Sequence, residues 1–207
     1  MTSRSKVLSF ALLCIAAALG LSLSPHHWAK TPQLKTGTLL APARPWADFS
    51  LIDNHGRGFG PAELRGAWSF MFFGYTNCPD YCPSTLTTLA TLVKELRADK
   101  TLTAPRVIFV SVDAKRDTPA QLDKYVPYFD SEFIGLTAAD QSTIESTVKK
   151  WNVFVAVQPA VDGSYTVDHS GDIFVIDPEG KLAAILTGPF TVEALSSDYR
   201  RIVSAGA

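Results

Sequence analysis

The sequence predicts an α/β domain in which a central mixed β-sheet carries helices on both faces. Two short and almost continuous apolar runs, Trp68–Phe73 and Arg106–Val112, are typical of strands buried on both faces, although periodicity alone does not distinguish such a run from a buried helix. Helical patterns follow both runs, and two further strand patterns and a helix end the chain. Strands that alternate with helices in this way place the helices over both faces of one sheet.

The remaining elements of the domain follow the same alternation. Thr118, with Pro119 next and Gln121 three residues on, is typical of a helix N-cap. The expected strands, besides the two apolar runs, are Asp48–Asp53, Phe133–Leu136, Val153–Val157, Tyr165–Asp168, Asp172–Asp177 and Lys181–Leu186. The expected helices are a single turn at Pro61–Leu64, residues 84–96, Pro119–Tyr128, a helix that begins at Asp140 or Ser142 and carries Ile144, Val148 and Trp151 on one side, and one capped by Thr191.

Three regions are expected along the 207 residues. Residues 1–24 contain an uncharged apolar stretch, Val7–Ser24, which follows two basic residues and predicts a transmembrane signal anchor with the rest of the chain outside the cytoplasm. A cleaved signal peptide is the alternative, because the stretch is at the short end of what spans a bilayer, but no small-x-small cleavage site follows it directly. Residues 25–45 lack sustained periodicity and are expected to form a linker, and residues 46–207 the globular domain.

Two features of the first two regions are interpreted as ordinary surface or membrane residues. Cys14 lies inside the apolar stretch after two leucines, which is a poor context for lipid attachment, so we expect a small membrane-facing side chain. His26 and His27 are adjacent in the linker and are expected to be solvated rather than bound to a metal ion.

The charge of the chain excludes one class of partner. The formal net charge is -1, and the basic and acidic residues are interspersed. There is therefore no basic stripe that would bind nucleic acid and no acidic tail, and nucleic acid is not expected as a partner.

Two cysteines lie where the first apolar run meets the next helix. Cys78 and Cys82 have i, i+4 spacing, which at the start of a helix would project both thiols from one face. A helix N-terminus favours thiolate over thiol, and thiolate is both a nucleophile and a soft metal ligand. Because sites in such sheets lie at the C-terminal ends of the strands, the Asp113–Asp117 loop is expected at the same edge. These residues leave redox chemistry and metal binding open, beside a plain disulfide or two inert thiols.

Several separated blocks of this sequence resemble the Sco/SenC family. The resemblance extends from about Phe49 to the end of the chain, and Ala114 departs from it where the family usually has proline, which removes no ligand. It implies a thioredoxin-like fold, a membrane anchor, copper binding and a role in assembling the binuclear copper centre in subunit II of cytochrome c oxidase. The blocks that carry the resemblance are Phe72–Pro83, Ser111–Pro119, Val167–Ser170 and Phe174–Gly180.

The resemblance also implies a ligand set. Cys78 and Cys82 correspond to the two thiolate ligands of the family and His169 to the third ligand. Soft thiolates select Cu(I), and an added imidazole also accommodates Cu(II). Asp168 is expected to orient the imidazole, as metal-bound histidines usually require. Asp80 is interpreted as a helix cap rather than an oxygen ligand.

Two functions from different classes are consistent with these residues. The first is a copper metallochaperone that receives copper from a donor protein and passes it by ligand exchange to a copper-accepting protein such as subunit II. The second is an extracytoplasmic thiol-disulfide oxidoreductase, in the periplasm or the mitochondrial intermembrane space, that keeps the cysteines of such a partner reduced. Exchange chemistry needs only the two sulfurs, so His169 favours the copper role. Asp113, Arg116 and Asp117 are expected to shape the neighbouring loop or a partner surface.

Overall fold

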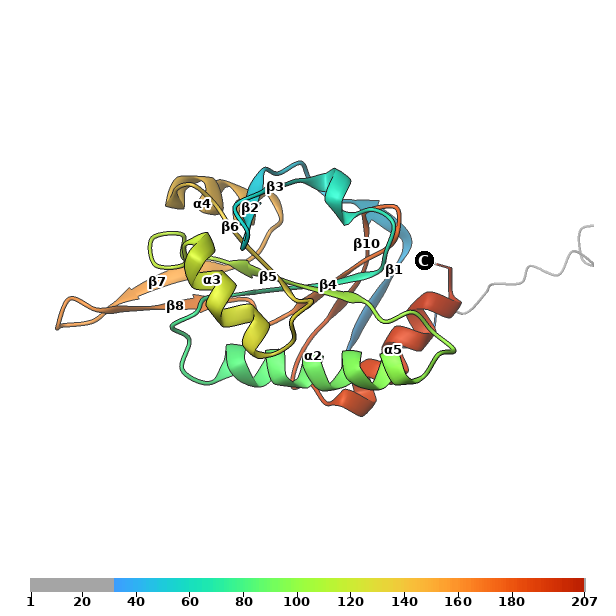
Figure 1. Ribbon diagram of the computed structural model, residues 1–207. Helices are drawn as coiled ribbons and strands as arrows, with labels where there is room; N and C mark the ends of the chain where they lie inside the picture. Colours follow the sequence, from blue (N-terminus) through green and yellow to red (C-terminus); the bar gives the residue numbers. More distant parts are fainter. Residues whose placement is uncertain (1–31, 207) are drawn as a thin grey trace, which may run out of the picture. The chain divides into compact units, whose positions relative to one another are not determined.

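One mixed sheet of eight strands organises the part of the chain that the structure describes, residues 32–206 of a computed structural model (Figure 1). Strands β4, β5 and β6 are parallel neighbours, and every other pairing in the sheet is antiparallel. This confirms the predicted mixed sheet. In their order across the sheet the strands are β1 (Gly37–Pro45), β10 (Lys181–Leu186), β9 (Ile173–Ile176), β4 (Ser69–Gly74), β5 (Arg106–Ser111), β6 (Ile134–Thr137), β2 (Leu51–Asp53) and β3 (Gly58–Phe59).

Both faces of β4 are buried, as its unbroken apolar run predicted. Phe70 and Phe72 pack into the core on one face of the sheet, whereas Met71 and Phe73 pack into the core on the other. A strand covered on both faces needs no polar alternation, which is why its sequence is continuous rather than periodic.

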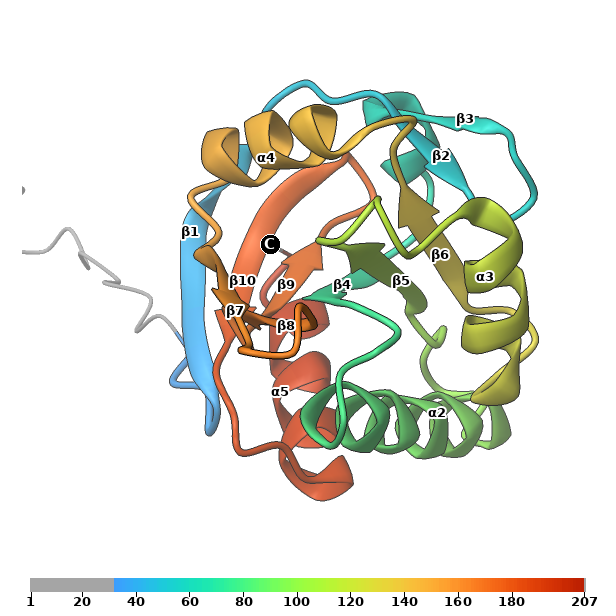
Figure 2. The ribbon, with the colours of Figure 1, turned by 90° about the vertical axis from the view of Figure 1, so that its left-hand side faces the viewer.

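The helices divide between the two faces, so the predicted helical cover on each side is confirmed. Leucines of α2, together with side chains of α3 and α5, fill the core on one face, whereas α4 and the 3-10 turn η1 cover the other (Figure 2). Helices α3, α4 and α5 begin after the N-caps Thr118, Asp140 and Thr191, whose side chains accept backbone N–H groups of the first turn. The helices are η1 (Pro61–Leu64), α2 (Tyr81–Ala98), α3 (Pro119–Tyr125), its continuation as the 3-10 turn η2 (Val126–Tyr128), α4 (Gln141–Lys150) and α5 (Val192–Ser204).

A separate two-stranded sheet projects from the edge of the domain. Strands β7 (Val155–Pro159) and β8 (Tyr165–His169) form an antiparallel hairpin and pair only with each other. Figure 1 shows this hairpin extending beyond the main sheet. Its turn contains Gly163 at φ 83°, a conformation that suits glycine, so the predicted hairpin turn is confirmed.

The prediction of a linker over residues 25–45 is wrong for residues 37–45. These residues form strand β1 (Gly37–Pro45), which pairs with β10. Only Leu39 of this strand is buried, and its prolines are tolerated because β1 is an edge strand. Asp198 of α5 fixes the residues just before the strand, since its buried carboxylate accepts hydrogen bonds from the backbone N–H groups of Lys35 and Thr36, each at 2.7 Å. The tertiary structure thus begins well before Trp46.

The expected membrane anchor, Val7–Ser24, lies outside the described residues, as do Cys14, His26 and His27. Between residues 32 and 206, no helix combines the length and the apolar character needed to cross a membrane. The predicted strand Asp48–Asp53 is shorter than expected, because only Leu51–Asp53 pairs with neighbouring strands.

Candidate metal centre

The two cysteines lie at the junction of β4 and α2, but only one of them is helical. Cys82 is in the first turn of α2, whereas Cys78 lies in the preceding loop, so the expected helical i, i+4 geometry is wrong. The loop nevertheless turns the Cys78 sulfur back onto the helix, where it accepts a hydrogen bond from the backbone N–H of Cys82 at 3.4 Å. Asp80 occupies the N-cap position as expected, yet its side chain makes no capping hydrogen bond.

The end of β4 is shaped to receive the Cys82 sulfur. Cys82 is fully buried, while Cys78 is half-buried at the surface. A Cβ atom on Gly74 would lie 2.7 Å from the Cys82 sulfur and 2.7 Å from the ring of Phe109. Glycine at this position therefore lets the buried sulfur approach the strand backbone.

The two thiols titrate in opposite directions because they share a hydrogen bond. The Cys82 thiol donates to the Cys78 sulfur, and this bond, assisted by backbone N–H groups, lowers the pKa of Cys78 to about 4. The same bond, together with burial, raises the pKa of Cys82. At neutral pH the more exposed sulfur is therefore the thiolate, and the buried sulfur carries the proton.

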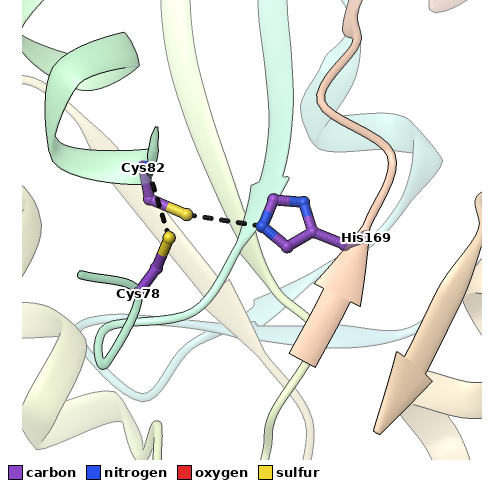
Figure 3. A group of neighbouring side chains, drawn as sticks. All are labelled: Cys78, Cys82 and His169. Carbon is purple, nitrogen blue, oxygen red and sulfur yellow. Dashed lines mark hydrogen bonds between the residues drawn. The ribbon is translucent and has the colours of Figure 1, made fainter. Parts of the chain in front are cut away.

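His169 completes a cluster of three soft or borderline donors. It is the last residue of β8, and its Nε2 atom lies 3.5 Å from the Cys82 sulfur (Figure 3). One atom from each of Cys78, Cys82 and His169 lies within 4.8 Å of the other two. The structure thus brings together all three residues that the sequence analysis singled out, from two elements far apart in the chain.

A backbone carbonyl orients the imidazole. The Nδ1 atom of His169 lies 3.0 Å from the carbonyl oxygen of Ser170, so Nδ1 carries the proton and donates it, which leaves the Nε2 lone pair facing the sulfurs. The expected role of Asp168 is wrong, because residues alternate faces along β8 and the Asp168 carboxylate instead accepts a hydrogen bond from Gln158 at 2.8 Å.

Three aromatic rings surround the imidazole. The ring centroids of Phe72, Tyr75 and Tyr81 lie 6.2, 6.1 and 6.5 Å from that of His169. Phe72 and Tyr75 are buried, whereas Tyr81 is 42% exposed. The Phe72 and Tyr75 rings lie edge-on to the imidazole, and the Tyr81 ring is tilted against it.

The loop after β5 supports the site without supplying a ligand, so the expected architectural role of its acidic residues is borne out. Asp117 is fully buried and accepts hydrogen bonds from Thr76, through N and Oγ1, and from Ser111. Burial raises the pKa of Asp117, although these hydrogen bonds favour its charged form. Asp113 pairs with Arg116, whose guanidinium lies over the Tyr165 ring.

An α/β domain that presents two thiols and an imidazole at one edge of its sheet belongs to the class of soft-metal-binding, thioredoxin-like proteins. The family described as SCO1/SenC matches residues 39–204. This chain therefore belongs to the SCO1/SenC family, as the resemblance of its sequence blocks indicated.

Individual relatives agree with this assignment. A Bos taurus protein named "Protein SCO2 homolog, mitochondrial" is 32% identical over 206 residues, which are 98% of this chain and 76% of that protein. The crystal structure of Arabidopsis thaliana ScoI with copper bound has a TM-score of 0.73 at 30% identity and covers 77% of this chain and 98% of its own. The structure of Bradyrhizobium japonicum ScoI with copper bound has a TM-score of 0.67 at 32% identity and covers 76% and 99% of the two chains. The thioredoxin-like fold is thus shared with these proteins.

Proposed function

We propose that this protein is a copper metallochaperone that holds copper through Cys78, Cys82 and His169 and assists assembly of the binuclear copper centre of cytochrome c oxidase subunit II. The observation that carries this proposal is the convergence of two sulfur atoms and one imidazole nitrogen within 4.8 Å of one another. The solved ScoI structures with copper bound support it, because they share both the family and the fold.

The chemistry of the three donors fits copper. Two thiolates provide the soft ligands that Cu(I) prefers, and the imidazole adds a nitrogen ligand that suits Cu(II). Cys78 is already a thiolate at neutral pH, and the Nε2 lone pair of His169 is already turned to the sulfurs. Only Cys82 must release a proton when the ion binds, so loading the site is coupled to proton release.

Unequal exposure of the ligands suggests the order of transfer. Cys78 and His169 lie at the surface, whereas Cys82 is buried. Thiolates of an accepting protein would reach the ion from the side of Cys78 and replace that ligand first. Cys82 would release the ion last, when it recovers its proton from solvent, so copper would not be free at any step.

The setting of the protein is part of the proposal. Residues 7–24 would anchor the chain in a membrane with the domain outside the cytoplasm, on the periplasmic side or in the mitochondrial intermembrane space. The partners would be a copper donor protein and a copper acceptor, either subunit II of cytochrome c oxidase or another copper protein. The Bos taurus relative is named as mitochondrial, which agrees with an extracytoplasmic location.

A second function is favoured by the opposite titration of the two thiols. In a thiol-disulfide oxidoreductase, the Cys78 thiolate would attack a partner disulfide, form a mixed disulfide and release one partner thiolate. Cys82, after losing its proton, would then attack the Cys78 sulfur and release the second partner thiolate. The partner would gain two electrons, and the Cys78–Cys82 pair would be left as a disulfide. Neither Cys78 nor Cys82 is in a disulfide in this structure, and the reduced pair is the form that such a reaction requires.

Copper titration of the two redox states separates these functions. Protein carrying Cys14→Ser, so that only the pair contributes thiols, would be prepared reduced and oxidised, and bound Cu(I), bound Cu(II) and free thiols would be counted. We expect one ion bound by the reduced protein and none by the oxidised protein, because a disulfide removes both sulfur ligands. Equal Cu(I) binding by the two forms would show that the ligand assignment is wrong and would favour the oxidoreductase.

A further inference from the structure

Tyr81 connects the two parts of the metal centre. It is the first residue of α2 and directly precedes Cys82. Its hydroxyl group donates a hydrogen bond to the carbonyl oxygen of Gly171 at 2.9 Å, across 90 residues of sequence. Gly171 lies two residues after His169, so this bond links the cysteine helix to the segment that carries the imidazole.

Two glycines make room for the Tyr81 side chain. A Cβ atom on Gly171 would lie 2.5 Å from the Tyr81 hydroxyl oxygen, and one on Gly188 would lie 3.0 Å from it. The first distance is shorter than any normal contact, so only glycine at position 171 permits the hydrogen bond as it stands. Tyr81 is thus seated between the segment after β8 and the segment after β10, beside a surface depression that His169 also lines.

The position of the Tyr81 contact matters because the hairpin forms no strand pairs with the main sheet and is held by the packing of Val167 in the core and by a few hydrogen bonds. At the start of β8, the Tyr165 hydroxyl donates to Asp113 at 2.9 Å, and Arg116 donates to the Tyr165 carbonyl oxygen at 3.1 Å. Beyond the end of β8, Tyr81 holds Gly171. His169 lies between these two attachments, so its distance from the sulfurs depends on both.

Neighbouring peptide groups transmit the effect of Tyr81 to the imidazole. The Ser170 carbonyl that accepts from His169 Nδ1 belongs to the peptide group directly before the Gly171 carbonyl that Tyr81 holds. Ser170 is otherwise bonded only within the hairpin, since its N–H donates to the Phe154 carbonyl at 3.0 Å and its hydroxyl accepts from the Phe154 N–H at 3.1 Å. Among residues 32–206, Tyr81 therefore provides the side-chain hydrogen bond that connects this turn to the cysteine helix.

We propose that Tyr81 is a positioning residue that sets the reach of His169 Nε2 to a metal ion held by Cys78 and Cys82. The inference rests on the proposed copper function and deepens it, because it predicts which oxidation state the contact affects. Cu(I) is held well by two thiolates, whereas Cu(II) depends more strongly on the nitrogen ligand. Loss of the Tyr81 hydrogen bond should therefore weaken Cu(II) binding and leave Cu(I) binding almost unchanged.

The test compares Tyr81→Phe with the unaltered protein and with His169→Ala as a reference. Phenylalanine keeps the ring and removes only the hydroxyl group. A lost hydrogen bond of this kind predicts Cu(II) dissociation about 2- to 10-fold faster. The Cu(II) absorption and electron paramagnetic resonance spectra should shift toward those of His169→Ala, which a purely structural role for the hydroxyl would not produce. Tyr128→Phe is the matched control, because the Tyr128 side chain is 85% exposed and the same hydroxyl group is removed.

Gly171→Ala tests the same hydrogen bond by altering the residue that accepts it. The added methyl group would displace the Tyr81 hydroxyl and should produce a similar change in the Cu(II) spectrum. Both substitutions remove the same hydrogen bond. The double variant should therefore have a Cu(II) affinity no lower than that of the single variant with the lower affinity. Additive losses would show that the two residues act independently and would overturn the inference.

The outcomes distinguish this inference from the function on which it rests. If the unaltered protein binds neither copper ion, the proposed function fails and the inference with it. If the unaltered protein binds Cu(II) and Tyr81→Phe has the same spectrum and dissociation rate, only the role of Tyr81 is refuted.

Discussion

The two sides of the metal centre are built in different ways. The sulfur side, Cys78 and Cys82, follows β4, which is paired on both edges by β5 and β9, and Cys82 is packed in the core. The imidazole side, His169, ends a strand that is paired only with its hairpin partner β7. The sulfur side therefore shares the stability of the whole domain, whereas the imidazole side is held by the packing of Val167 and by hydrogen bonds outside the main sheet.

This difference suggests that the sulfur ligands and the imidazole ligand have different functions. Disulfide formation and Cu(I) binding require only the sulfur side, which is fixed. Cu(II) binding requires the imidazole side as well, and this side has no strand pairing with the main sheet. We therefore expect substitutions on the sulfur side to affect every activity of the site, and substitutions on the imidazole side to affect Cu(II) selectively.

The largest effect is expected from Cys82→Ser. This change replaces the buried soft ligand by a hydroxyl group, so both copper ions should bind more than ~100-fold more weakly, beyond the loss usual for a residue that only orients a ligand. Equilibrium competition with a copper chelator measures this loss, and Cys14→Ser is the control. Retention of tight Cu(I) binding by Cys82→Ser would remove the distinction between the two sides.

His169→Ala should affect the binding of Cu(II) and Cu(I) to different extents. We expect Cu(II) binding to weaken roughly 100-fold and Cu(I) binding to change by less than about tenfold, because the thiolates remain. The same competition measurements, made with Cu(I) under anaerobic conditions, check this result. An equal loss for both ions would mean that the imidazole is as essential as the sulfurs.

Asp117→Ala should lower the stability of the whole domain. It leaves donors of Thr76 and Ser111 without their acceptor in a buried site, which costs about 2–4 kcal/mol. Urea denaturation measures the change, and Asp48→Ala is the control because Asp48 is exposed and has no part in the site. A loss confined to the loop, with the midpoint of unfolding unchanged, would contradict the view that the sulfur side is part of the core.

Tyr165→Phe should loosen the imidazole side alone. It removes the hydrogen bond to Asp113, worth about 0.5–1.5 kcal/mol, and keeps the ring that packs against Arg116. Amide hydrogen exchange should become faster in β7 and β8 but not in β4. Tyr128→Phe serves as the control, and faster exchange throughout the domain would show that the hairpin is not an independent part.

The smallest change is expected when the pH is varied between 8 and 6. Because the pKa of Cys78 is lowered to about 4, its thiolate is present throughout this range, and its rate of alkylation by iodoacetamide should be nearly constant. The rate should fall by half only near pH 4. A midpoint at pH 8 to 9, as for an ordinary thiol, would show that Cys82 does not stabilise the Cys78 thiolate.

Much of the fold follows from local patterns in the sequence. The run that forms β4 is apolar throughout because both of its faces are covered, and the N-caps Thr118 and Thr191 begin helices where expected. Strand β1 lacks such a pattern, because it is an edge strand with one buried residue and two prolines. Its pairing with β10 is a property of the tertiary structure and not of its own residues.

Only part of the site could be predicted from local sequence patterns. The cysteines are near each other in sequence, whereas His169 meets Cys82 across 87 residues, and without the family resemblance it would have been interpreted as a loop histidine. The backbone carbonyl of Ser170 carries no side-chain signal at all. Tyr81 could have been noticed from its place between the cysteines, but nothing in the sequence indicates its contact with Gly171.

The early start of the folded domain limits how far the site can stand from a membrane. Asp198 fixes the chain at Lys35, so an anchor that ends at Ser24 would leave only residues 25–34 as a free tether. Fully extended, these residues reach about 35 Å, roughly half of the ~75 Å available to a linker that ran to residue 45. If the proposed anchor is present, the domain could then serve only acceptors whose copper ligands lie within that reach of the membrane surface.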